Sequence, residues 1–285
     1  MKVGVRPCNY LCKQMPHATV QHATVQHGSA GFGFPEAVSG ESPQAESAAV
    51  TLAEPLPAKA PREPGCGNSP RRTAQHMESE LRQLIATVSE SHLHALLEAL
   101  FGSQTESWKA FREAPAAKRY HQAYTHGLLE HTLTVALSVS ALAEIFTEVD
   151  RDTAVTGALI HDIGKLDTYE RLDDNRIEMT AAGRLQGEIS LGYYRIRREV
   201  EQISGFPGEL ERALLHIVIS HHGALEHGSP VVPCTREATL VHMADNVGAK
   251  LGSFDRIERQ LDPGTQWAGY DRGLGAAAYF SSSLA

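Results

Sequence analysis

The chain has little of what marks disulfide-rich, membrane or strongly basic proteins. It has no Cys-x-x-Cys pair, which argues against a structural zinc site and favours reduced thiols. A run of about 18 apolar residues, as a membrane span needs, is missing, and so is a signal-peptide pattern. The net charge of −8 gives no overall attraction to nucleic acid. We therefore expect a cytoplasmic protein with no membrane partner. Its four cysteines are Cys8, Cys12, Cys66 and Cys234.

Alternating strand patterns are also nearly absent, whereas 42% of the 285 residues are hydrophobic, which is ample for a packed core. From Met77 onward apolar residues recur at helical spacing, and this predicts an all-α fold built as a helical bundle. No serine or cysteine stands in a nucleophile motif. The predicted helices are 79–101, 106–114, 125–148, 152–166, 180–203, 208–222 and 236–252.

Composition divides the chain into three segments. Residues 1–76 are rich in Pro, Gly, Ala and Ser without a period, which predicts a disordered, low-complexity leader. Its repeat HATVQHATVQH at 17–27 leaves a metal-binding tract open as an alternative, although histidines five apart do not share a helical face. Residues 77–262 form the predicted helical domain. The Gly/Ala/Ser-rich residues 263–285 predict a flexible C-terminal tail.

The stretch LIHDIGKL at 159–166 places a charged residue on an apolar helical face. Asp162 shares that face with Val155, Leu159 and Leu166. A buried carboxylate without a partner costs several kcal/mol, so a counter-charge is expected.

The same anomaly recurs on other predicted helices. A lone inward histidine is usually a hydrogen-bonded core residue, and a lone inward aspartate is often a cap or an arginine partner. Several of them on four helices favour one common partner, a divalent metal that turns buried carboxylates and neutral imidazoles into ligands. The residues are His131, His161, Asp162, His221, His222 and Asp245.

The order H…HD…HH…D resembles the HD superfamily of metal-dependent phosphohydrolases, and more narrowly the YhaM-type 3′→5′ exoribonucleases. The resemblance covers roughly residues 80–280, and its most specific stretch has the elements GSP-x-x-P and ADN-x-x-AK. The matching stretches are APAAKRYHQAYTHGLLEHTLTVA at 114–136, ALIHDIGKL at 158–166, SHHGALEHGSPVVPCTREATLVHMADNVGAKL at 220–251, and the W…Y…R spacing at 267–272.

The resemblance implies an HD-domain helical bundle that binds one or two divalent ions. Mn²⁺ is favoured, with Fe, Zn²⁺, Co²⁺ or Mg²⁺ as alternatives. The family pattern has a histidine where this chain has Glu188, which either binds as an anionic ligand or leaves a second metal weakly bound. The implied metal ligands are His131, His161, Asp162, Glu188, His221, His222 and Asp245, and the implied substrate-binding residues are His121, Tyr124, His126 and Lys165.

The implied activity is metal-assisted hydrolysis of phosphodiester bonds, with a single-stranded RNA or DNA cut from its 3′ end. Asp162 would orient the reacting groups, Lys165 would stabilise charge on the phosphate, and His222 would protonate the leaving group, with His121 or His126 as alternatives. The competing interpretations are a small-molecule nucleotide phosphohydrolase and a vestigial nucleic-acid-binding or relaxase-associated module. The relatives carry an N-terminal OB-fold, and residues 1–76 show no such strand pattern, so we expect that module to be missing.

Overall fold

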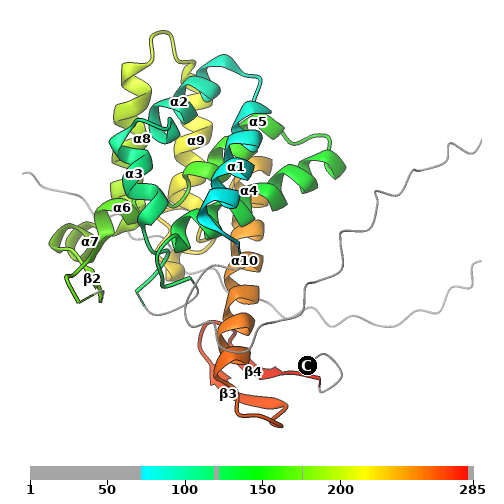
Figure 1. Cartoon of the computed structure of the whole chain (residues 1–285). Helices are drawn as coiled ribbons and strands as arrows, with labels where there is room; N and C mark the ends of the chain where they lie inside the picture. The colour runs from blue at the N-terminus through cyan, green and yellow to red at the C-terminus, as the bar shows by residue number, and fades with distance from the viewer. Residues whose placement is uncertain (1–71, 119–121, 175, 282–285) are drawn as a thin grey trace, which may run out of the picture. The chain divides into compact units, whose positions relative to one another are not determined.

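The computed structural model describes residues 72–118, 122–174 and 176–281. The predicted leader lies outside the described residues except for its last five positions, and so does His121. By its internal contacts the chain divides into Met1–Ala60 and Pro61–Ala285, and every described residue belongs to the second unit. This unit is dominated by helices, so the prediction of an all-α fold is confirmed (Figure 1).

The helices follow one another with short connections, as expected for a bundle. They are α1 (Ala74–Ala86), α2 (Ser91–Phe101), α3 (Glu106–Glu113), α4 (Gly127–Ile145), α5 (Arg151–Ile160), α6 (Lys165–Thr168), α7 (Ala181–Gln186), α8 (Glu188–Gln202), α9 (Gly208–Ser220) and α10 (Arg236–Gln260), with a short 3₁₀ helix at Leu225–His227.

Helix α4 lies at the centre of the bundle and packs against α1, α3, α5 and α10. Its Leu128, Leu133, Val135 and Val139 are fully buried, which is how α4 contributes to the core. By length and composition α4 is long and apolar enough to cross a membrane, but 56% of its apolar stretch is buried inside the protein, as in the core helix of a bundle.

Side-chain caps set where several helices begin. Thr73 accepts a hydrogen bond from the backbone N–H of His76, so α1 begins three residues before the predicted boundary at Met77. Glu90 caps α2 by accepting from the N–H of Leu93 at 2.6 Å. This cap explains why the predicted helix 79–101 is two helices.

The predicted helix 152–166 is also interrupted, and here the reason is a close approach between two segments. Helix α5 ends at Ile160, and the chain turns before α6. A Cβ atom on Gly164 would lie 2.0 Å from the carbonyl oxygen of Glu188 and 2.5 Å from the amide nitrogen of Gly192. Only glycine allows this contact, which brings the turn after α5 against the start of α8.

Two antiparallel hairpins complete the described structure. Strand β1 (Tyr169–Arg171) pairs with β2 (Ile177–Met179), with Glu170 opposite Glu178. Strand β3 (Trp267–Asp271) pairs with β4 (Ala276–Tyr279) and has a register shift between Trp267 and Tyr270.

The β3–β4 hairpin corrects the expectation of a flexible tail from residue 263. Its Ala278 is 1% exposed, and Asp271 accepts a hydrogen bond from Arg256 of α10 at 2.6 Å. The Gly/Ala/Ser-rich composition does not predict this hairpin, because the hairpin is stabilised by contacts with α10 and not by a pattern of large apolar side chains.

Candidate metal centre

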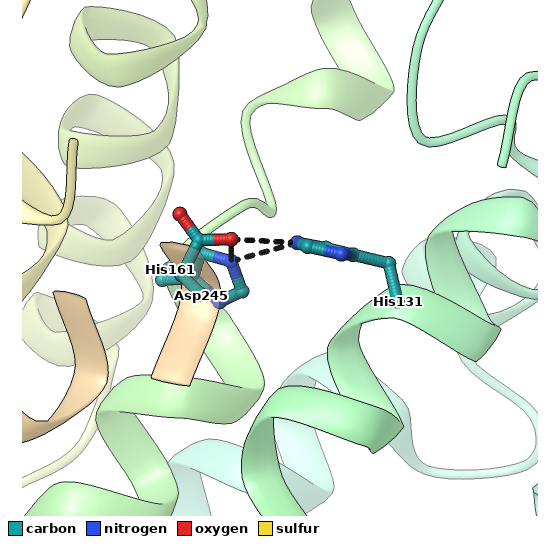
Figure 2. A group of neighbouring side chains, drawn as sticks. All are labelled: His131, His161 and Asp245. Carbon is teal, nitrogen blue, oxygen red and sulfur yellow. Dashed lines mark hydrogen bonds and ion pairs between the residues drawn. The ribbon is translucent and has the colours of Figure 1, made fainter. Parts of the chain in front are cut away.

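The polar residues on the inner helical faces converge at one place. His131 comes from α4, His161 and Asp162 follow the last residue of α5, and Asp245 comes from α10. Figure 2 shows His131, His161 and Asp245 with their side chains directed toward one another. His221 and His222 follow the end of α9, and Glu188 is the first residue of α8. The structure therefore brings together all seven predicted ligands.

The first group consists of His131, His161 and Asp245, each offering a ligand atom within 4.8 Å of the others. The Nε2 atom of His131 lies 3.1 Å from Oδ1 of Asp245 and 3.3 Å from Nε2 of His161. Both imidazoles are buried and Asp245 is partly buried, so three ligand atoms converge on one place and leave room for a further ligand of a cation.

The second group consists of Glu188, His221 and His222, whose ligand atoms also lie within 4.8 Å of one another. His222 Nε2 is 3.1 Å from Glu188 Oε1. Asp162 connects the two groups, because its Oδ2 lies 3.1 Å from His131 Nε2 and its Oδ1 lies 3.6 Å from His221 Nε2. One carboxylate thus offers an oxygen to each group.

In three histidines the hydrogen bond is made by Nδ1, which leaves Nε2 available to bind a metal. The Nδ1 atoms of His161, His221 and His222 lie 2.7, 2.8 and 2.9 Å from the carbonyl oxygens of Ala158, Val218 and His227. A carbonyl oxygen only accepts, so each Nδ1 carries the hydrogen and donates it. In the neutral ring the Nε2 lone pair then faces the cluster, as in histidines that bind metals.

Two buried polar atoms in the cluster have no hydrogen-bond partner among the described residues, Oδ1 of Asp162 and Nε2 of His221. They face each other at 3.6 Å, which is beyond hydrogen-bonding distance. Unsatisfied buried groups of this kind cost free energy unless another partner binds them. An oxygen and an imidazole nitrogen that share one gap are suitable ligands for Mn²⁺, Fe or Zn²⁺, so the residues fit a divalent metal.

The pKa values show that the cluster requires positive charge. Burial alone would lower the pKa of His131, but Asp162 and Asp245 outweigh it and raise the pKa to about 9. Burial lowers the pKa of His221, which keeps that ring neutral. A proton on His131 thus offsets the negative charge of two carboxylates, and a divalent cation would supply positive charge in the same place.

Lys165 is a cation that binds Asp162 directly. Its Nζ donates to Asp162 Oδ2 at 2.7 Å, and the residue is 8% exposed. Burial opposes both charges, but the pair holds the pKa of Asp162 well below its usual value and that of Lys165 above its usual value. The ammonium group predicted to reach the phosphate is therefore engaged with Asp162.

Two of the predicted substrate-binding residues form hydrogen bonds with residues outside the two ligand groups. Tyr124 donates to Glu130 Oε2 at 2.5 Å, and His126 Nδ1 donates to the carbonyl oxygen of Arg112 at 2.6 Å. His126 has a left-handed backbone, with φ of 68°, just before α4. The ring of His126 is thus bonded to the last turn of α3, and His126 belongs to neither of the two ligand groups.

Two cavities adjoin the cluster, with volumes of about 260 Å³ and about 420 Å³. Lys165 and Glu188 line the first, and His222 and Asp245 line the second. Arg272 lines both; it is the arginine of the W…Y…R spacing at 267–272, to which the resemblance gave no role in the site. The available signal was the aromatic pattern of WAGYD followed by the glycine-rich RGLG, which is typical of a hairpin.

Comparisons with known proteins agree with this geometry. Residues 128–250 match the family model of the HD domain. The 3′-5′ exoribonuclease YhaM of Shouchella clausii (strain KSM-K16) is 31% identical over 188 residues, which are 66% of this chain and 57% of that protein. The 3′-5′ exoribonuclease YhaM of Bacillus subtilis (strain 168) is 32% identical over 154 residues, 54% of this chain and 48% of that protein.

The chain thus spans less than three fifths of the length of these curated relatives. No solved structure matches it significantly. The family match covers the segment from α4 to α10, which includes every residue of the two ligand groups. Over residues 128–250 the chain is therefore similar to an HD domain.

Proposed function

We propose that this protein is a metal-dependent phosphohydrolase that cleaves phosphodiester bonds, and that its substrate is a single-stranded RNA or DNA shortened from the 3′ end. The observation that carries the proposal is Asp162, whose two oxygens face two groups of buried ligands. The similarity to proteins named 3′-5′ exoribonuclease supports a strand shortened from its 3′ end as the substrate. A cytoplasmic location is part of the proposal.

Each ligand group would hold one ion. His131, His161, Asp245 and Oδ2 of Asp162 form the first set, and Glu188, His221, His222 and Oδ1 of Asp162 form the second. The mixture of imidazole and carboxylate favours Mn²⁺ or Fe, with Zn²⁺, Co²⁺ and Mg²⁺ as alternatives. A divalent ion held there lowers the pKa of a coordinated water and neutralises charge on a phosphoryl oxygen.

The chain's own residues orient the reacting groups. Lys165 keeps Asp162 ionised and fixed by its 2.7 Å hydrogen bond. His222 has one ring nitrogen bonded to the carbonyl oxygen of His227, so only Nε2 is available. Its two predicted roles, metal ligand and proton donor, therefore exclude each other. The contact of 3.1 Å between Nε2 and Glu188 favours the ligand role.

Exposed aromatic side chains support a nucleic-acid strand over a free nucleotide as substrate. Trp267, Tyr270 and Tyr279 of the β3–β4 hairpin are 61%, 73% and 49% exposed, and the rings of Trp267 and Tyr279 lie 4.9 Å apart. Aromatic surfaces of this kind stack on bases of single strands without sequence preference. The same hairpin provides Arg272 beside the metal ligands, so a strand on it would lead to the site.

The test begins with elemental analysis of the purified protein, followed by assays with Mn²⁺ on single-stranded oligonucleotides labelled at the 5′ or the 3′ end. We expect bound metal and stepwise release of nucleoside monophosphates from the 3′ end. Asp162→Ala should abolish hydrolysis, whereas Asp262→Ala, an exposed aspartate beyond α10, should not. Normal turnover by Asp162→Ala would disprove the mechanism.

Salt dependence separates the substrate classes. Binding of a strand releases counterions and should weaken steeply as salt rises, whereas binding of a mononucleotide should respond little. Hydrolysis of free nucleotides with no activity on strands would favour the nucleotide phosphohydrolase. Strand binding without any hydrolysis would favour the vestigial binding module.

A further inference from the structure

The turn of the β3–β4 hairpin forms part of the wall beside the metal ligands. Arg272 and Gly273 line the cavity that holds Lys165 and Glu188, and they also line the cavity that holds His222 and Asp245. Both cavities adjoin the second ligand group, through Glu188 and His222, and the second cavity also adjoins Asp245 of the first group. The turn between β3 and β4 is therefore close to both halves of the candidate metal centre, although it is remote from them in sequence.

The turn is held in place by hydrogen bonds. Oδ1 of Asp271 accepts from the N–H groups of Gly273 and Leu274 at 2.9 and 3.1 Å, and its Oδ2 accepts from Nη2 of Arg256 at 2.6 Å. Lys250 of α10 donates to the carbonyl oxygen of Leu274 at 3.4 Å. The hairpin thus continues from the end of α10 and folds back on that helix (Figure 1).

The turn also packs closely on α10. A Cβ atom on Gly273 would lie 3.1 Å from the hydroxyl oxygen of Ser253, which is itself 2% exposed. Because Asp271 and Gly273 are both fixed, the backbone position of Arg272 between them is defined. A binding group on a fixed turn loses less freedom when a ligand binds.

Arg272 is a cation without an internal partner. It makes no hydrogen bond or ion pair with any residue of the described ranges, whereas Arg256 nearby is paired with Asp271. Lys165, the other cation of the first cavity, already binds Asp162. A phosphate group in these cavities would meet the carboxylates of Glu188 and Asp245. Lys250 lines the second cavity and donates to the carbonyl oxygen of Leu274, whereas Arg272 lines both cavities and has no partner in the described ranges.

We infer that Arg272 binds the reacting phosphate of the substrate and that the β3–β4 hairpin is a wall of the active site. The guanidinium group presents a planar fork of donors that matches two phosphate oxygens. This inference rests on the proposed function, because it assigns to that site a phosphate ester as ligand.

The experiment compares Arg272→Ala, Arg272→Lys and Arg259→Ala in the full chain loaded with Mn²⁺. Arg259 is the matched control, since it is an exposed arginine of α10 that lines neither cavity and has no ion pair in the described structure. One assay measures kcat/KM for bis(4-nitrophenyl) phosphate, a diester with a single phosphate. A second measures the Kd of thymidine 5′-monophosphate by calorimetry, and elemental analysis measures metal content.

Arg272→Ala should lower kcat/KM about tenfold to a hundredfold and weaken nucleotide binding by a similar factor, since one charge-assisted hydrogen-bond pair is lost. Arg272→Lys should recover part of both losses because it keeps the charge without the fork. Metal content and thermal unfolding should stay as in the wild type, and Arg259→Ala should match the wild type.

The outcomes separate this inference from the proposed function. If the wild-type protein binds the nucleotide but hydrolyses no ester, the proposed function is refuted. The role of Arg272 can still be tested by comparing the Kd of the nucleotide for wild type and Arg272→Ala. Equal affinity of Arg272→Ala and wild type for the nucleotide would overturn the inference, whatever the hydrolysis rates. Loss of metal in Arg272→Ala would also overturn it, since the residue would then support the ligands.

Discussion

The buried ligand cluster and the exposed β3–β4 hairpin face the same cavities but are built in opposite ways. In the cluster, the carboxylate of Asp162 and the imidazoles of His131, His161 and His221 are at most 3% exposed, and hydrogen bonds orient the rings. In the hairpin, Arg272 has no partner in the described ranges, and Trp267 is 61% exposed. The buried cluster suits an ion that stays bound, and the exposed hairpin suits a substrate that binds and dissociates.

The largest effect should come from removing a ligand of the first group. His161→Ala deletes an imidazole that is 1% exposed and lies 3.3 Å from both His131 and Asp162. We expect loss of about one ion per chain and no detectable hydrolysis. Elemental analysis with an activity assay checks this. His94→Ala, on α2 outside the cluster, is the control, and full activity of His161→Ala would remove His161 from the ligand set.

A smaller loss is expected from the second group. Glu188→Gln keeps the shape of the side chain but removes the charge that lies 3.1 Å from His222. Activity should fall about tenfold to a hundredfold and recover partly at high Mn²⁺, because the weakened ligand lowers affinity for one ion only. Titration of activity against Mn²⁺ measures this. Glu188→His tests the family's usual ligand, and unchanged metal dependence in both variants would show that residue 188 does not bind metal.

The exposed aromatic side chains of the hairpin should contribute to strand binding and not to hydrolysis of the phosphodiester bond. Trp267→Ala removes one ring of the exposed pair with Tyr279. The Kd for a single-stranded oligonucleotide should rise about tenfold, since stacking on one base contributes about 1–3 kcal/mol. Turnover of bis(4-nitrophenyl) phosphate should not change. If both substrates are affected equally, the hairpin acts through the structure of the site and not through stacking.

The smallest effect on activity should come from a carboxylate outside both regions. Oδ2 of Asp152 accepts hydrogen bonds from the N–H and hydroxyl of Ser89 at 2.7 Å and from the N–H of Glu90 at 2.9 Å. Burial opposes the charge of Asp152, but these bonds and Arg151 lower its pKa. Asp152→Ala should lower the free energy of unfolding by about 2 kcal/mol without changing kcat.

The same contacts give a pH dependence with a definite sign. A carboxyl group whose pKa is lower in the folded than in the unfolded protein stabilises the fold above the unfolded value of 3.8. That stabilisation is lost as pH falls below 3.8 toward the lowered value. Denaturant unfolding of wild type and Asp152→Ala should therefore differ most near neutral pH and converge in acid. A constant difference down to the lowest pH would contradict the assignment.

The helical spacing of apolar residues was sufficient to predict much of the fold of this protein. The pattern at 125–148 predicted α4 to within three residues at each end, because the apolar face of a buried helix repeats every turn. The inward positions of His131 and Asp245 followed from the same periodicity, whereas Asp162 lies in the turn after α5. The breaks at Thr87–Glu90 and at His161–Gly164 did not, since a capping carboxylate and a glycine fitted against α8 depend on neighbours that periodicity does not report.

The sequence by itself determined the order H…HD…HH…D of its imidazoles and carboxylates, and this order lies within the segment that matches the HD-domain model. Only the tertiary structure decided that Asp162 lies between two ligand groups, that Lys165 is bound to it, and that Arg272 joins them from the far end of the chain. The physical reason is the sequence distance over which each kind of information acts. Periodicity reports which face of a helix is buried, whereas the partners on that face come from segments distant in sequence and are chosen by packing.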